Sequence, residues 1–163
     1  MRADQFERLY DEHAAPLLAF LTYRTGNRVV AEDILADTFE RVLRTRRRFD
    51  PRKASEKTWL YSIALNLVRD DARRRGAESR ALERSVPVAS GEGTTAVDVV
   101  DERDSLGRAI ETLSDEERES IALRYGAELT LPEIARLTGE KLTTVEGRVY
   151  RALRKLRDEL EPG

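Results

Sequence analysis

The segment TLPEIARLTGEKLTTVEGRVYRALRKLR, residues 130–157, decides the class of fold that this sequence predicts. Its apolar residues recur every three or four positions on both sides of Gly139, which is typical of two amphipathic helices joined by a tight turn. The segment therefore predicts a helix-turn-helix. Ala135, Val145 and Val149 are the residues expected to pack its two helices together.

The second of these helices has a polar face that can meet a partner. Its candidate contact residues are Thr143, Thr144, Glu146, Arg148, Arg151 and Arg154. In DNA-binding domains of this type, side chains near the start of the second helix enter the major groove, and basic side chains contact phosphates. DNA binding is the interpretation that we prefer, and an ordinary helical hairpin is the alternative.

Four capping-box patterns predict where helices begin. They pair Asp4 with Glu7, Ser114 with Glu117, Thr130 with Glu133, and Thr143 with Glu146. Upstream of the helix-turn-helix, apolar residues at helical spacing predict helices over about residues 4–25, 28–48, 55–75, 104–113 and 115–126. Gly26, Pro51 and Gly76 are expected to end the first three of these helices.

Residues 77–103 show no sustained apolar period and contain proline and a Ser-Gly-Glu-Gly-Thr-Thr run. That composition predicts a linker. We therefore expect an all-α protein of two small helical domains joined by a flexible acidic linker. The N-terminal helical bundle covers residues 1–80, the linker covers 81–103, and the C-terminal helix-turn-helix domain covers 104–163.

Charge is segregated along the chain, although the net charge is only −2. Residues 41–80 carry 13 basic and 5 acidic residues, and residues 81–120 carry 4 and 11. Residues 145–157 carry 5 basic residues and 1 acidic residue. Two basic tracts separated by an acidic one suggest two contacts with nucleic acid, with solvated helix faces as the alternative.

The first basic tract combines cations with aromatic and amide groups, which suits single-stranded or melting DNA. We interpret Trp59 as a core residue and the polar residues as the functional ones. They are Arg52, Lys53, Asn66, Arg69, Arg73 and Arg74.

An acidic stripe is expected on the second helix. Asp33, Asp37 and Glu40 lie at positions i, i+4 and i+7, beside Ile34 and Phe39. The stripe is either a docking surface for a basic partner or a solvated face.

Composition excludes several classes of function. The chain has no cysteine and a single histidine, His13, which leaves no thiolate metal site and no basis for a Ser-His-Asp triad. We predict no catalytic residue, no metal and no cofactor. No apolar run approaches the roughly 18 residues of a membrane span, so we expect a cytoplasmic protein without membrane insertion.

Three motifs in order resemble the extracytoplasmic-function (ECF, group 4) sigma factors of bacterial RNA polymerase. Residues 30–42 contain VAEDI followed by an aspartate, a phenylalanine and a valine, and resemble the core-binding helix of the family. Residues 59–74 contain WLYSIALN followed by an aspartate and two arginines, and resemble its −10-reading helix. Residues 113–152, from LS through EIA and TV to RVYRA, resemble its −35-reading domain.

The resemblance implies a function for each motif. Asp33, Ile34, Asp37 and Phe39 would dock on the clamp helices of the polymerase core, which is built on the beta and beta-prime subunits. Asn66, with neighbours that include Asp70, would capture unstacked −10 bases. The linker would thread the core toward the RNA path.

The chain departs from the family pattern at two positions. Ala36 stands where glutamine is usual, and Glu146 stands where a basic or polar residue is common. The expected partners are the polymerase core and promoter DNA, and whether an anti-sigma factor also binds stays open. The alternatives are a sigma-like regulatory decoy, a helix-turn-helix repressor and an enzyme.

Overall fold

The structure, a computed structural model, describes residues 2–85 and 101–161; for residues 82–85 and 101–104 it describes the helix but not the side chains. The chain forms two compact units, Met1–Thr95 and Ala96–Gly163. All regular structure in the described ranges is helical, as the sequence predicts. No described helix is both long and apolar enough to cross a membrane. The centre of the expected acidic linker, residues 86–100, lies outside the described ranges.

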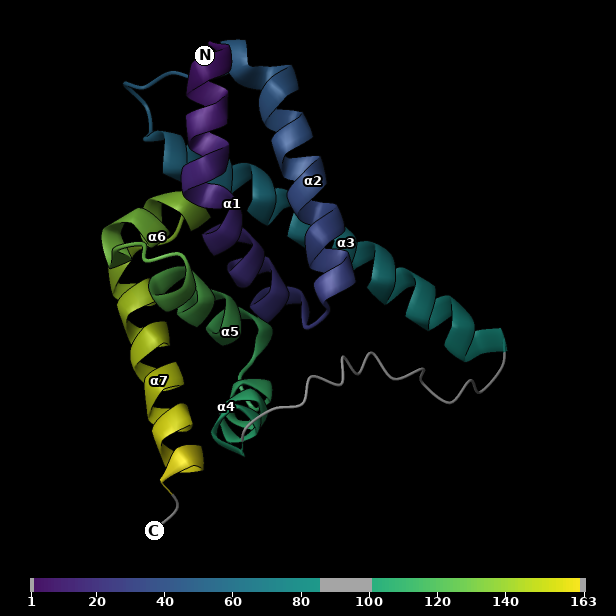
Figure 1. Ribbon diagram of the computed structural model, residues 1–163. Helices are drawn as coiled ribbons and strands as arrows, with labels where there is room; N and C mark the ends of the chain where they lie inside the picture. The colour runs from purple at the N-terminus through teal and green to yellow at the C-terminus, as the bar shows by residue number, and fades with distance from the viewer. Residues whose placement is uncertain (1, 86–100, 162–163) are drawn as a thin grey trace. The chain divides into compact units, whose positions relative to one another are not determined.

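The first unit begins with a hairpin of two long helices, α1 (Ala3–Thr25) and α2 (Arg28–Thr45), shown in purple and blue in Figure 1. Gly26 closes the turn between them with a φ of 70°, a left-handed conformation that costs glycine little. Asn27 then caps α2, since its side-chain oxygen accepts a hydrogen bond from the backbone N–H of Val29 at 2.9 Å.

The start of α1 differs from the sequence prediction. The helix begins at Ala3, and the Gln5 side chain accepts a hydrogen bond from the Arg2 backbone N–H at 2.7 Å. The expected box of Asp4 with Glu7 is therefore wrong. The side-chain oxygen of Gln5 accepts a hydrogen bond as a glutamate oxygen would. The helix cap therefore lies at Arg2, two residues before the predicted cap at Asp4.

The end of the third helix also differs. α3 (Glu56–Ser85) runs straight through Gly76, where the sequence predicts a stop. Glycine inside a helix costs only about 1 kcal/mol, and the arginine, alanine and glutamate residues around Gly76 favour helix strongly enough to offset that cost. The helix thus enters the first residues of the predicted linker.

The core of the first unit forms where α3 packs against the hairpin. Its fully buried members include Leu9, Leu17, Phe20, Leu21, Ala31, Val42, Leu60, Tyr61 and Ala64. The rings of Phe20 and Tyr61 meet edge to face, with centroids 5.7 Å apart. Within the described residues the buried Tyr61 hydroxyl has no hydrogen-bond partner, and burial raises its pKa far above the ordinary value.

The second unit is coloured green to yellow in Figure 1. Its elements are α4 (Asp101–Glu111), α5 (Asp115–Ile121), the π-helical turn η2 (Ala122–Gly126), α6 (Leu131–Thr138) and α7 (Leu142–Leu160). Ala152 and Leu156 of α7 pack against Ala109 and Leu113. Ser114 caps α5 in a capping box with Glu117, as the sequence predicts.

Candidate functional site

The predicted helix-turn-helix is formed by α6 and α7 of the second unit. Thr130 caps α6, since its hydroxyl accepts a hydrogen bond from the Glu133 backbone N–H at 3.2 Å. Gly139 ends α6 with a φ of 70°, and its N–H donates to the Ala135 carbonyl. This tight turn delivers the chain to α7 only three residues later.

The buried side chains of α7 decide which of its faces points outward. Val145 and Val149 are buried, as expected, and so is Ala152. The exposed residues on the rest of the predicted contact face are Thr143, Thr144, Glu146, Arg151 and Arg154. Hydroxyl, carboxylate and guanidinium groups together can both donate to and accept from base edges, and the guanidinium groups can also contact phosphates.

The first turn of α7 corrects one sequence prediction. The helix begins at Leu142 after Lys141, without a side-chain cap. The capping box of Thr143 with Glu146 is therefore wrong, because both residues already lie inside the helix. Within the described residues the Glu146 carboxylate has no hydrogen bond or ion pair, so it is free to accept from an outside donor.

Arg148 is the one predicted contact residue of α7 that does not face outward. Its guanidinium donates two hydrogen bonds to Glu140, one of them from Nη1 to Oε1 at 2.8 Å, and lies 3.9 Å from a Glu116 oxygen. Its side chain is only 12% exposed. The hydrogen bonds that Arg148 donates to Glu140 raise the Arg148 pKa. The expectation that Arg148 is free to face a partner is wrong, because its guanidinium already interacts with the carboxylates of Glu140 and Glu116.

Gly147 lies on α7 between Glu146 and Arg148, a position that the sequence analysis did not single out. A Cβ built on Gly147 would meet only the tip of the Arg151 side chain, at 3.2 Å. Glycine inside a helix lowers its stability, but here it lets the tip of the Arg151 side chain lie close to the backbone of α7.

A second ion pair joins α7 to the start of α5. The Lys155 ammonium donates to Glu117 at 2.7 Å, and the Glu117 side chain is 8% exposed. Burial would raise the pKa of Glu117, but hydrogen bonds from Lys155 and Ser114 outweigh it and hold that pKa below the ordinary value. The pair therefore fixes α7 against α5.

The polar residues predicted on α3 lie in different surroundings. Asn66 is exposed, and within the described residues its amide has no partner, so it can read a base edge. Arg69 is half-buried. Asp70 and Arg73 pair with each other one turn apart.

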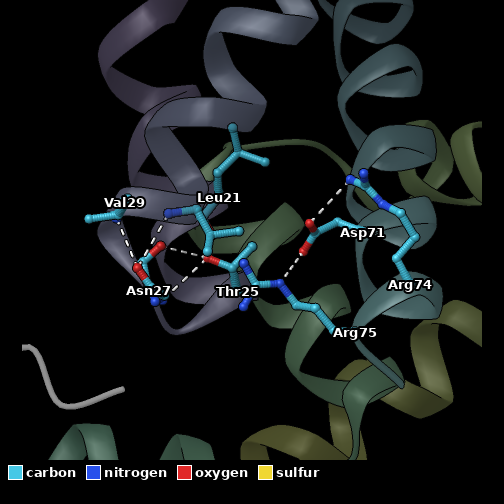
Figure 2. Close-up of polar contacts among 8 residues, drawn as sticks. Leu21, Thr25, Asn27, Val29, Asp71, Arg74 and Arg75 are labelled. Carbon is cyan, nitrogen blue, oxygen red and sulfur yellow. Dashed lines mark hydrogen bonds and ion pairs between the residues drawn. The ribbon is translucent and has the colours of Figure 1, made fainter. Parts of the chain in front are cut away.

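Asp71, which the sequence analysis did not select, holds two arginines. Its carboxylate lies 3.5 Å from Arg74 and accepts a 2.8 Å hydrogen bond from Arg75, as Figure 2 shows beside the Asn27 turn. The Asp71 side chain is 17% exposed. Arg74, one of the predicted contact residues, is thus partly neutralised by a neighbour.

The loop before α3 carries the other predicted cations of the first unit. The rings of Phe49 and Trp59 lie 5.1 Å apart, and Trp59 is half-buried rather than fully buried as a core residue would be. Arg52 pairs with Asp50 at 3.3 Å. Lys53 is exposed.

The acidic stripe on α2 is real, but its apolar neighbours are not exposed. Asp33, Asp37 and Glu40 are exposed. Ile34 and Phe39 are each only 5% exposed. The Phe39 ring packs against Tyr10 and Phe6 of α1, with centroid distances of 4.8 and 6.1 Å. Phe39 therefore packs in the α1–α2 interface rather than at the surface, and a docking role for Ile34 and Phe39 stays a prediction.

Sequence reasoning also missed the three arginines of η1 (Arg46–Arg48), which follow α2 directly. Arg47 and Arg48 are exposed, and Arg46 is half-buried. The signal was present in the charge count, because residues 41–53 carry seven basic residues and one acidic residue.

Comparison with known families gives two matches in chain order. A family model described as Sigma-70 region 2 matches residues 9–78, and one described as Sigma-70, region 4 matches residues 103–156. The chain is 30% identical over 156 residues to the ECF RNA polymerase sigma factor RpoE of Cereibacter sphaeroides, covering 95% of this chain and 86% of that protein. It is 30% identical over 158 residues to the RNA polymerase sigma factor CarQ of Myxococcus xanthus, covering 96% and 90%.

A third relative is longer than this chain. The ECF RNA polymerase sigma factor BldN of Streptomyces coelicolor is 30% identical over 166 residues, which is 94% of this chain but 60% of BldN. Two solved structures share the fold. They are RpoE with the anti-sigma factor NepR from Bartonella quintana (TM-score 0.81, 23% identity, 98% and 99% coverage) and CnrH with the cytosolic domain of CnrY (0.73, 23%, 98% and 90%).

Proposed function

The chain belongs to the ECF sigma factors of the sigma-70 family, which direct RNA polymerase in transcription initiation, and we propose that it binds the polymerase core and promoter DNA through separate surfaces. The observation that carries the proposal is the exposed polar face of α7, held on a helix-turn-helix within the part of the chain that matches region 4. We also propose membership of the group 4 subclass.

The second unit is proposed to read duplex DNA at the −35 element. Thr143, Thr144, Glu146 and Arg151 are the residues proposed to meet base edges or nearby phosphates, and Arg154 follows one turn further along α7. An exposed side chain on the N-terminal half of the second helix is where this motif contacts bases. Arg148 is proposed to contribute by holding α7 in place.

The first unit is proposed to bind both the core and the melted −10 element. For DNA, the free amide of Asn66 supports base reading, and Lys53 and Arg52 support backbone contacts, with Arg69, Asp70, Arg73 and Arg74 further along α3. For the core subunits, beta and beta-prime, the proposed contacts are the exposed carboxylates of Asp33, Asp37 and Glu40.

An anti-sigma factor is a further partner that we propose. RpoE of Bartonella quintana was solved with one, and CnrH was solved with the cytosolic domain of CnrY. The proposal includes no catalytic group in this chain, since its work is binding, and it places the protein in the cytoplasm, where the polymerase acts.

Run-off transcription tests the proposal. The purified chain is mixed with polymerase core and a library of promoter fragments, and transcript starts are mapped. We expect co-purification with core and discrete starts that core alone does not give. Asp37→Arg should weaken core binding while leaving helicity unchanged, because Asp37 is exposed.

Other outcomes would point to the rival functions. Core binding without a transcript on any fragment would indicate a regulatory decoy. DNA binding without core binding would indicate a repressor.

A further inference from the structure

Many cationic side chains of the first unit lie beside a carboxylate on their own helix. Arg28 pairs with Glu32, and Arg44 pairs with Glu40, each one turn along α2. The arginines beside Asp70 and Asp71 on α3 are paired in the same way. Such pairs leave little net charge for an outside partner.

Arg46, Arg47, Arg48 and Lys53, which we call the basic corner, differ from these. Within the described residues none of the four side chains has a hydrogen bond or an ion pair. Arg47, Arg48 and Lys53 are exposed. Asp50 is the acidic residue among residues 41–53, and its carboxylate is paired with Arg52. The positive charge of the corner is therefore uncompensated.

The chemistry of the corner fits phosphodiester groups. Three consecutive guanidinium groups repel one another, and a partner with closely spaced negative charges relieves that repulsion. Guanidinium groups bind phosphate oxygens through two parallel hydrogen bonds, which a single ammonium group does not do. The corner also continues directly into the loop that carries Arg52 and leads to α3.

We propose that the basic corner binds the sugar-phosphate backbone of promoter DNA beside the −10 element, as an affinity contact that reads no sequence. The inference rests on the proposed function and extends its DNA surface to Arg46, Arg47 and Arg48. Phosphate contacts fix the register of a protein on DNA and make its affinity depend on salt.

The test compares two double variants of the full chain in the holoenzyme. Binding to a promoter recovered by the run-off selection is measured from about 50 to 200 mM salt, on duplex DNA and on a fragment with a mismatched, open −10 region. With Arg47→Gln/Arg48→Gln, the slope of log affinity against log salt should fall by about 1.8 on the duplex, at 0.9 per contact. Wild type should therefore lose about tenfold more affinity across the range than the variant. Preference among −10 bases should not change.

Arg8→Gln/Arg28→Gln is the matched control. It removes the same charge from two exposed arginines that are paired with Glu56 and Glu32. We expect it to keep the wild-type slope. Circular dichroism and melting temperature should match wild type for both double variants, because neither touches the core.

Each other result overturns the inference. A wild-type slope for the corner variant, or an equal loss in the control, would show that the corner makes no DNA contact of its own. A loss of core binding by the corner variant would make the corner a protein-docking surface. If the wild-type chain starts no transcript at all, the proposed function fails and the corner proposal falls with it.

Discussion

Arg148 and Glu140 form a two-point clamp between α7 and the turn before it. The Arg148 guanidinium donates two hydrogen bonds back across eight residues, and a Glu116 oxygen from α5 lies 3.9 Å away. One side chain of α7 thus fixes the angle at which that helix leaves the turn. Val145 and Val149 fix only which face of α7 points inward.

Arg148→Ala should lower the free energy of unfolding of the second unit by about 2–3 kcal/mol, because it removes the two hydrogen bonds that Arg148 donates to the half-buried Glu140. Arg148→Lys should recover little, since an ammonium group cannot form the same pair of bonds. Hydrogen exchange of the α7 amides in the full chain measures the loss for the second unit alone. A double-mutant cycle with Glu140→Gln should show coupling between the two residues. Unchanged exchange together with lost −35 binding would mean that Arg148 leaves Glu140 for DNA.

Gly147→Ala should stabilise α7 by up to about 1 kcal/mol, because its new methyl group meets only the movable tip of Arg151. The same change should weaken −35 binding, because the new methyl group displaces the tip of Arg151 on the proposed contact face. Gly107→Ala on α4 is the control, a helical glycine with nothing within 4 Å of its added carbon. It should bring the gain in stability without the loss in binding. Equal DNA binding by both variants would mean that the position of the Arg151 tip beside Gly147 has no role.

Glu146→Gln should relax the preference at one −35 base pair by about 1–3 kcal/mol. The carboxylate can only accept hydrogen bonds, and the major-groove donor that suits it is the N4 amine of cytosine. Arg154→Ala should instead weaken binding to all sequences and reduce its salt dependence. Selection on randomised −35 sequences measures both effects. An unchanged base preference for the glutamine variant would remove Glu146 from the reading surface, and no capping role remains to explain it.

Glu117→Gln should lower the free energy of unfolding of the second unit by about 1–2 kcal/mol near neutral pH. It should also make that free energy depend less on pH in the acid range. The pKa of Glu117 in the folded protein lies below its ordinary value of 4.5. The pair with Lys155 therefore stabilises the fold fully above that ordinary value, and its contribution is lost as the pH falls through the lowered pKa. Hydrogen exchange of the α7 amides, measured across an acid pH series, should show this difference between wild type and the variant. The exposed Glu159→Gln should keep the wild-type profile.

The sequence predicts which face of a single helix is buried, because that face follows a repeating pattern. It does not predict contacts that depend on how the chain runs from one helix to the next. The spacing of Val145, Val149 and Ala152 correctly predicts the inward face of α7. The clamp of Arg148 on Glu140 depends on the geometry of the Gly139 turn, and no local pattern encodes it. The resemblance to the family implies a docking role for Phe39, but the motif does not show that Tyr10 and Phe6 of another helix pack against its ring.

The predicted helix boundaries at Gly76 and Thr143 are wrong for a related reason. A glycine such as Gly76 is a weak stop when its neighbours favour helix, and the difference of about 1 kcal/mol is too small for a pattern to decide. At α7, a Thr–Glu pair has the right spacing for a cap but lies after Leu142, where the helix has already begun.

The continuation of α3 past Gly76 has a consequence for how the first unit ends. Residues 77–81 are all exposed, so no core packing supports them, and a helix without packing is only marginally stable in water. That terminal stretch can fray and rewind at almost no free-energy cost. At about 1.5 Å per residue, each turn that unwinds shortens the rod by about 5 Å. The first unit thus ends in a helical segment whose length can change without disturbing the packed residues that precede it in α3.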